Sequence, residues 1–188
     1  MQKQTNQTGA GFSLVEVLVS LCLLSIGVMG AASMQLSALR STQQSGFYNI
    51  ALQLATEIAE QVRNTSGTSF GAGSNPLLTL DFKSSEQVPG ATGLCWDVGS
   101  SCDGADMAAF GAYEVQRRLK TMLPQGQIKV CRDAAPWDDQ AHSYRWDCDG
   151  AGSDAPIVVK LGWRDPGKGQ AGAAKPDAVP QLVLQVQS

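Results

Sequence analysis

Two patterns of apolar residues occupy the first third of the chain. Residues 12–39 are apolar apart from scattered Ser, Gln35 and Glu16, and residues 17–39 carry no charge. About 20 helical residues span the core of a bilayer, so this stretch predicts a membrane-spanning helix. Residues 40–64 continue as an amphipathic helix, with one face against a folded domain and the other in solvent. Its apolar positions are Phe47, Ile50, Ala51, Leu54, Ala55, Ile58 and Val62.

Breakers follow this second stretch at residues 64–67, so the helix is expected to end there. A continuous helix from Phe12 to Asn64 would be about 80 Å long. That length exceeds a membrane span, and roughly half of the helix must therefore belong to the folded domain.

The rest of the chain, residues 65–188, predicts a small domain of helix and sheet. Residues 65–104 are rich in Gly, Ser, Thr and Asn, and are expected to form a connection with little regular structure. Residues 105–123 have a helical pattern that Pro124 and Gly126 end. Short alternating or apolar runs predict strands at 127–131, 144–148, 157–163 and 182–186. Sequential strands of this kind favour an antiparallel sheet, and the whole predicts an α+β fold with the long helix laid on the sheet.

Composition gives no sign of a nucleic-acid partner or of a catalytic centre. The 188 residues carry a net charge of −3 without a basic patch, which removes the electrostatic basis for nucleic-acid binding. A phosphate-binding Gly loop and a G-x-S-x-G motif are both missing from the sequence. His142 has no nucleophile motif beside it and is interpreted as a surface residue. We therefore predict no catalytic residue and no cofactor.

The cysteines divide into one apolar and four polar positions. Cys22 lies in the apolar stretch and is interpreted as a small membrane residue, while the other four lie in the polar remainder. An even set of four outside the cytosol predicts two disulfides, which can pair in three ways. Loop closure favours the local pairs Cys95–Cys102 and Cys131–Cys148. A zinc site is the alternative, but no C-x-x-C spacing supports it.

Clustered acids raise the question of a calcium loop. Asp97, Asp103 and Asp106 lie near two glycines, but their spacing does not match an EF-hand, so solvated acids and no metal are predicted. A second group of acids, Asp138, Asp139, Asp147 and Asp149, is also interpreted as solvated. The tryptophans Trp137, Trp146 and Trp163 are expected in the core or at its rim.

A carboxylate and a glycine at the start of the apolar stretch suggest how it is processed. A secretory signal peptide would be cleaved after its apolar region, and residues 30–33 are the nearest small-residue candidate there. Gly11 instead precedes the apolar stretch and offers a cleavage site on the N-terminal side of that stretch. A carboxylate such as Glu16 at the edge of an uncharged membrane span costs free energy, and such residues are usually functional. The alternative is an interfacial glutamate near the lipid headgroups, where the free-energy cost is small.

The processing motif of type IV prepilins is similar to Gly11-Phe12-Ser13-Leu14-Val15-Glu16. In that family a prepilin peptidase cleaves after the Gly and methylates the new N-terminal Phe. The resemblance implies that residues 1–11 are a leader peptide, that Phe12 becomes the N-methylated first residue, and that 12–39 is the membrane and polymerisation segment. Gly11 lacks a Cβ that would obstruct the peptidase. Glu16 would meet the N-terminal ammonium of a neighbouring subunit, an attraction of roughly 4 kcal/mol before desolvation, and so set the register between subunits.

Further similarity is to the PilV class of minor pilins. One part of the similarity is that residues 12–39 are joined to an amphipathic stretch that ends at Val62-Arg63-Asn64. The other parts are the segments Val15-Glu16-Val17-Leu18-Val19 and Leu24-Ser25-Ile26-Gly27. The resemblance implies a non-catalytic minor pilin that joins other minor pilins and the major pilin, primes pilus assembly, and sits at the tip with an adhesin in support of twitching and attachment. It places the chain in the bacterial inner membrane as a single-pass protein with a periplasmic C-terminal domain, and then in the pilus at the cell surface.

Two other functions fit parts of the sequence. The motif from Gly11 to Glu16 also serves pseudopilins of type II secretion systems. A membrane-anchored periplasmic enzyme or binding domain would need neither cleavage at Gly11 nor Glu16.

Overall fold

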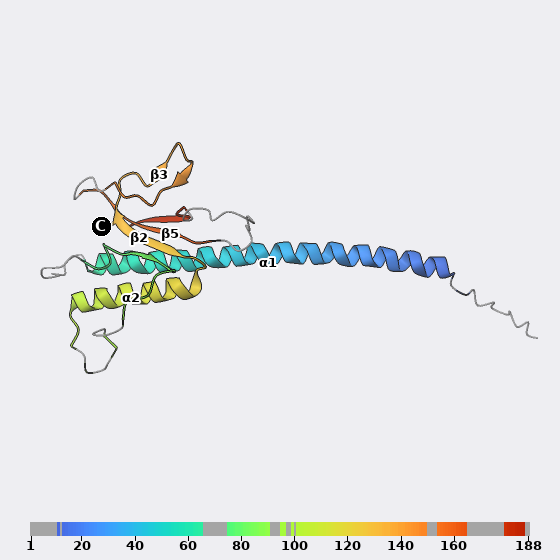
Figure 1. Ribbon diagram of the computed structural model, residues 1–188, viewed down its shortest axis with the longest axis horizontal. Helices are drawn as coiled ribbons and strands as arrows, with labels where there is room; N and C mark the ends of the chain where they lie inside the picture. The colour runs from blue at the N-terminus through green and yellow to red at the C-terminus, as the bar shows by residue number, and fades with distance from the viewer. Residues whose placement is uncertain are drawn as a thin grey trace, which may run out of the picture. The chain divides into compact units, whose positions relative to one another are not determined.

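The computed structural model describes residues 11, 13–65, 75–90, 95, 96, 99, 101–149, 154–164 and 179–186. Within them the fold is α+β, as predicted, with a long N-terminal apolar helix and a small antiparallel sheet (Figure 1). The chain divides into two compact units, Met1–Gln43 and Gln44–Ser188. Helix α1, Leu14–Asn64, passes through both, and the expected end at Asn64 is confirmed.

The sheet of the second unit has four antiparallel strands in the order β1-β2-β5-β6. They are β1 (Asp81–Lys83), β2 (Gln127–Arg132), β5 (Ile157–Gly162) and β6 (Leu182–Val186). Val130 of β2 lies opposite Val159 of β5, and Leu161 of β5 lies opposite Leu182 of β6. The predictions of strands at 127–131, 157–163 and 182–186 are therefore confirmed.

Residues 65–104 were expected to have little regular structure, and in their described part the strand β1 forms and pairs with β2. One expectation for the strands was wrong. Residues 144–148 were expected to be a strand of the main sheet. The strand β4 (Ser143–Tyr144) instead pairs with β3 (Trp137–Asp138) in a separate two-stranded sheet. Trp146 and Cys148 lie outside any strand, so their alternation with charged residues does not come from sheet pairing.

One face of the sheet and two helices enclose the hydrophobic core of the second unit. Alternate side chains of the strands join the buried faces of the later part of α1 and of α2 (Gly104–Met122), and the helix expected at 105–123 is confirmed. Trp163 is buried in this core and contacts Tyr48 edge to face. The central members of the cluster are Ala51, Leu54, Ile58, Phe82, Val115, Leu119, Ile128, Val130, Val159 and Leu161.

Two acids of the first cluster, Asp103 and Asp106, form the N-terminus of helix α2. The Asp103 carboxylate accepts hydrogen bonds from the backbone N–H groups of Ala105 and Asp106 at 2.8 and 2.9 Å, and the Asp106 carboxylate accepts one from the Asp103 N–H at 3.1 Å. This reciprocal arrangement is a capping box, which satisfies donors that a helix N-terminus leaves free. Asp97 lies outside the described residues. In the described part of the chain, no group of three His, Cys, Asp or Glu side chains is placed to hold a metal ion.

Candidate functional site

The start of α1 carries the residues that the sequence marked for processing. Gly11 is exposed, and Phe12, the expected cleavage and N-methylation position, lies outside the described residues. The Ser13 carbonyl accepts hydrogen bonds from the N–H groups of Glu16 and Val17 at 3.0 and 3.2 Å, so the helix begins directly after Ser13. Glu16 thus occupies the first turn, where the positive end of the helix dipole favours a carboxylate.

The first unit presents an apolar helix with every described side chain exposed. Residues 14–43 bury none of their side chains, and Met29 and Met34 are about three-quarters exposed at 74% and 77%. By length and composition, α1 is able to cross a membrane once. The hydroxyls of Ser20, Ser25 and Ser33 donate to helix carbonyls at 2.7–2.9 Å, so they add no unsatisfied donor to this surface.

Glu16 differs from the hydroxyls in having no partner for its charge. Among the described residues, no side chain forms an ion pair or hydrogen bond with its carboxylate. An ionised carboxylate that enters an apolar environment without a partner is strongly unfavourable. An apolar medium that surrounded this position would therefore have to supply a counter-charge, neutralise the carboxylate or keep it near water.

Both disulfides of the second unit join the cysteines favoured by loop closure. Cys95 is bonded to Cys102, and Cys131 is bonded to Cys148. The second bond closes a loop that begins in β2 and contains the β3–β4 hairpin. Figure 1 shows this hairpin on the side of the sheet opposite α1. Cys22 is a free and exposed thiol in the apolar part of α1.

A buried ion pair fixes the same loop to the sheet. Lys160 of β5 and Asp133 are both completely buried, and the Lys160 ammonium donates to the Asp133 carboxylate. The same ammonium donates to the backbone carbonyls of Arg145 and Asp147 at 2.9 and 2.6 Å. All three of its donors are therefore used, which is the condition under which a buried lysine can stay charged.

This pair makes the stability of the domain depend on pH. Burial raises the pKa of Asp133, but the Lys160 ammonium and the backbone N–H groups of Ala135 and Asp149 lower it further, so the pKa lies below its ordinary range. The ion pair then contributes stability above about pH 4, and this contribution is lost as the pH falls through the lower folded-state pKa. In thermal unfolding at a series of pH values, we expect Asp133→Asn to remove part of the acid-side decline. An identical decline in both proteins would contradict this assignment.

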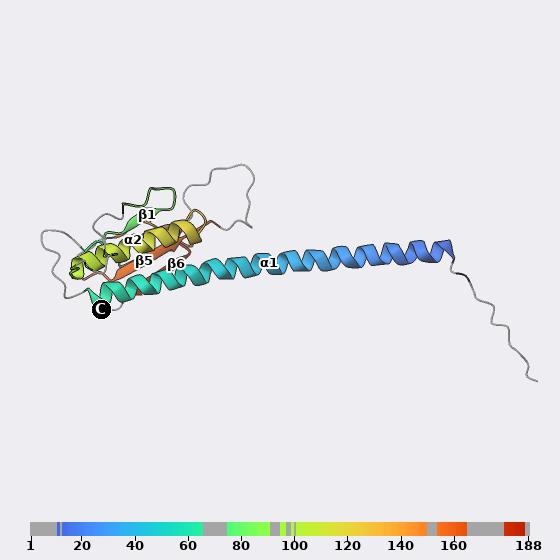
Figure 2. The same ribbon diagram turned by 90° about the horizontal axis from the view of Figure 1, so that it is seen from below.

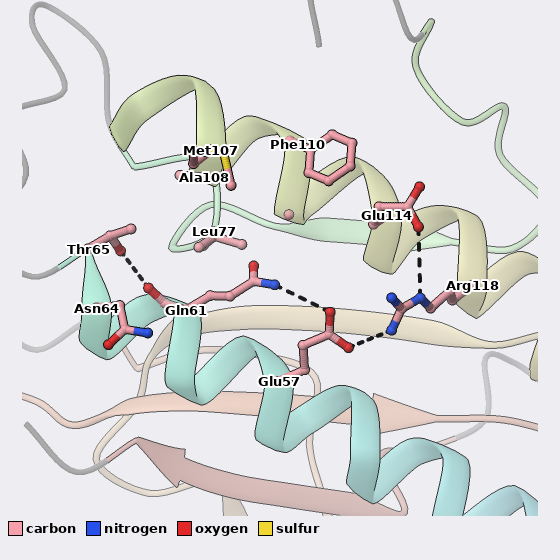
Figure 3. Close-up of a pocket in the computed structure, with 11 residues that line it drawn as sticks. Glu57, Gln61, Asn64, Thr65, Leu77, Met107, Ala108, Phe110, Glu114 and Arg118 are labelled. Atoms are coloured by element: carbon pink, nitrogen blue, oxygen red, sulfur yellow. Dashed lines mark hydrogen bonds and ion pairs between the residues drawn. The ribbon is translucent and has the colours of Figure 1, made fainter. Parts of the chain in front are cut away.

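A second group of facing polar side chains lines a pocket between the later part of α1 and α2 (Figure 3). Its volume is about 320 Å³. Glu57 accepts hydrogen bonds from Arg118 at 2.6 Å and from Gln61 at 3.4 Å. A Cβ added at Gly111 would meet the amide end of the Gln61 side chain, which is flexible and would have to move aside.

The carboxylates of this pocket are occupied in ion pairs. Arg117 binds Glu114 at 2.9 Å, and this hydrogen bond holds the pKa of Glu114 below its usual range despite the burial that opposes it. Arg118 lies within 3.8 Å of Glu114 and also pairs with Glu57. A carboxylate with a lowered pKa is a poor proton acceptor at neutral pH. These ion pairs therefore suit a structural contact between α1 and α2 better than a proton-transfer site.

The remaining sequence candidates are surface and turn residues. His142 is exposed in the β3–β4 turn, where its φ of 48° places it in the left-handed region. Asp138 accepts from the N–H groups of Gln140 and Ala141 in the same turn, and these hydrogen bonds lower its pKa. Trp137 is 44% exposed and packs edge to face on Tyr144, as expected for an aromatic residue at a rim.

No protein-family model matches the chain, and no curated protein or solved structure matches it either.

Proposed function

We propose that the chain is a type IV pilin-like subunit, anchored in the inner membrane by the first part of α1 until it is assembled. Within that class, we propose a non-catalytic minor pilin resembling the PilV class. It would join other minor pilins and the major pilin to prime assembly of a pilus that supports twitching and attachment, and a tip adhesin is an expected partner.

The observation that carries the proposal is Glu16 in the first part of α1, where residues 14–39 are exposed and carry no other charge, on a helix that continues into a folded domain. A simple anchor needs the apolar surface but not the carboxylate, which is costly in a membrane. A subunit that is released from the membrane into a helical assembly can use the carboxylate, because a new N-terminal ammonium at Phe12 of a neighbour would pair with it.

The domain fits a protein that works outside the cytosol. Two disulfides close loops in it, and such bonds persist in oxidising compartments. The later part of α1 buries one face in this domain, so the helix joins the anchor directly to the folded part within one element.

Processing tests the proposal directly. We expect co-expression of the full chain with a prepilin peptidase to give a mature protein that begins at N-methylated Phe12, as measured by intact mass and N-terminal sequencing. Gly11→Val should block cleavage, because a branched side chain then stands beside the scissile bond.

The matched control is Gly9→Val, which makes the same change two residues upstream and should leave cleavage intact. A chain that keeps its first residues beside an active peptidase, or that is cleaved near residues 30–33, would overturn the pilin proposal. The latter result would favour a secreted domain, and the former a membrane-anchored enzyme or binding domain.

A further inference from the structure

Strand β5 is buried on both of its faces, by different parts of the domain. Val159 and Leu161 belong to the core that the sheet shares with α1 and α2 (Figure 2). Side chains alternate along a strand, so Val158 and Lys160 point to the opposite face. They are 2% and 0% exposed and lie outside that core cluster. This second face is turned toward the side of the sheet on which Figure 1 shows the β3–β4 hairpin.

Residues 133–147, which carry this hairpin and are all described, form a cover over Lys160. The Lys160 ammonium donates to the Asp133 carboxylate in the first arm of the cover. In the second arm it donates to the backbone carbonyls of Arg145 and Asp147. An ammonium has three donors, and all three are used here by acceptors of the cover. One buried side chain of β5 therefore binds both arms of the cover to the sheet.

The cover takes no part in the hydrophobic core. None of residues 133–147 belongs to the core cluster, and Asp133 is the single buried residue among them. Removing one partner of the buried ion pair in place leaves an uncompensated charge, whereas opening the cover returns both charges to water, which is much less costly. The bond between Cys131 and Cys148 lies at the base of the cover and restricts the open chain. The disulfide is therefore the contact that decides whether the cover opens.

We propose that residues 133–147 are a redox-controlled cover, which the Cys131–Cys148 disulfide keeps closed over Lys160 and which opens when a dithiol reduces that bond. In this reaction the dithiol gives up two electrons and two protons. The S–S bond breaks, both cysteines become thiols, and the dithiol becomes a disulfide. The Lys160 ammonium then enters water while the core stays folded. The cover is open in a reducing compartment and closed in an oxidising one, where disulfides persist.

Acetylation of lysine side chains tests the opening. The full chain in detergent, with Cys22→Ala to remove its free thiol, would be treated briefly with acetic anhydride before and after reduction by dithiothreitol, and acetylated Lys160 measured by peptide mass spectrometry. A disulfide that closes a loop of this length shifts the balance toward the closed form by roughly a hundredfold. We expect acetylation of Lys160 to be at least about tenfold faster after reduction, with no change at the exposed Lys120.

Paired cysteine variants show which disulfide controls the cover. Cys131→Ser with Cys148→Ser should give the fast acetylation of Lys160 without any reductant. The matched control, Cys95→Ser with Cys102→Ser, removes the other disulfide and should keep Lys160 protected until the dithiol is added. Fast acetylation in the control before reduction would contradict the assignment to Cys131–Cys148.

Paired acid variants test the role of the ion pair. In the reduced chain, Asp133→Asn should raise the acetylation rate of Lys160 further, because the closed form loses its counter-charge. Asp138→Asn makes the same change in the β3–β4 turn, where the carboxylate accepts from backbone N–H groups of the turn, and should have no effect on Lys160. An equal effect of the two variants would show that the ion pair does not hold the cover closed.

Amide hydrogen exchange shows whether the cover opens alone. The amides of Val159 and Leu161 should stay protected after reduction, because β5 remains paired in the folded sheet. Lys160 that stays unreactive in the reduced chain would overturn the proposal. Reactive Lys160 together with lost protection of β5 would overturn it too, because the whole domain would then have unfolded. Failure of cleavage at Gly11 would overturn the proposed function and leave these results unchanged.

Discussion

Lys160→Met is expected to lower the stability of the folded domain by about 3–5 kcal/mol, the range measured when one partner of a buried ion pair is removed. Methionine fills much of the same space but leaves the buried Asp133 carboxylate without its counter-charge. The carbonyls of Arg145 and Asp147 also lose their donor. Chemical unfolding of the full chain in detergent, followed by tryptophan fluorescence, measures the change.

The matched control is the double variant Lys160→Met, Asp133→Asn. Its asparagine is neutral and can still accept the N–H of Ala135, which the Asp133 carboxylate accepts at 3.0 Å. We therefore expect the double variant to recover at least about 1 kcal/mol relative to Lys160→Met, because the unpaired charge is gone. A small and equal effect in both variants would show that the pair contributes little.

Glu16→Ala is expected to leave cleavage at Gly11 intact and to lower incorporation of the protein into fibres at least about tenfold. A tenfold loss corresponds to about 1.4 kcal/mol, well within the attraction of a carboxylate and an ammonium at close range. The variant keeps the apolar helix and its hydroxyl hydrogen bonds, so membrane insertion should persist. The measurement compares the mature protein in sheared fibres with that in the membrane.

Glu16→Gln separates charge from shape in this experiment. Glutamine keeps the size of the side chain but cannot neutralise an ammonium, so we expect a loss close to that of Glu16→Ala. Ser20→Ala, a neutral change one turn further along the same exposed helix, should behave as wild type. Normal pili and motility in Glu16→Ala, with the protein recovered in the fibres, would refute the role of Glu16 in assembly.

Elements with a long periodic pattern could be predicted from the sequence. The extent of α1 followed from its apolar stretch and its three-and-four spacing, and α2 from a similar pattern with a clear stop at Pro124. β2, β5 and β6 were short apolar runs between turn residues. The two disulfides followed from the spacing of the four polar-region cysteines once an oxidising compartment was assumed.

Features that depend on distant contacts could not be predicted. β1 has three residues in a region rich in Gly and Ser, and it is a strand because β2 lies beside it. The pattern at residues 144–148 was misleading, because Cys148 is fixed by its bond to Cys131 and not by a ladder of backbone hydrogen bonds. Lys160 is a lone charge in an apolar strand, and its partner Asp133 lies far from it in the sequence, so local patterns do not indicate the pair.

The hydroxyls that bond back onto α1 bear on how the helix would respond to a change of surroundings. Because Ser20, Ser25 and Ser33 satisfy their donors within the helix, neither lipid nor a protein neighbour has to supply a partner for them. Moving such a segment from one apolar medium to another exchanges similar dispersion contacts and alters few hydrogen bonds. Glu16 carries the only charged side chain of residues 14–39, so a difference between the two media would act most strongly on that single carboxylate.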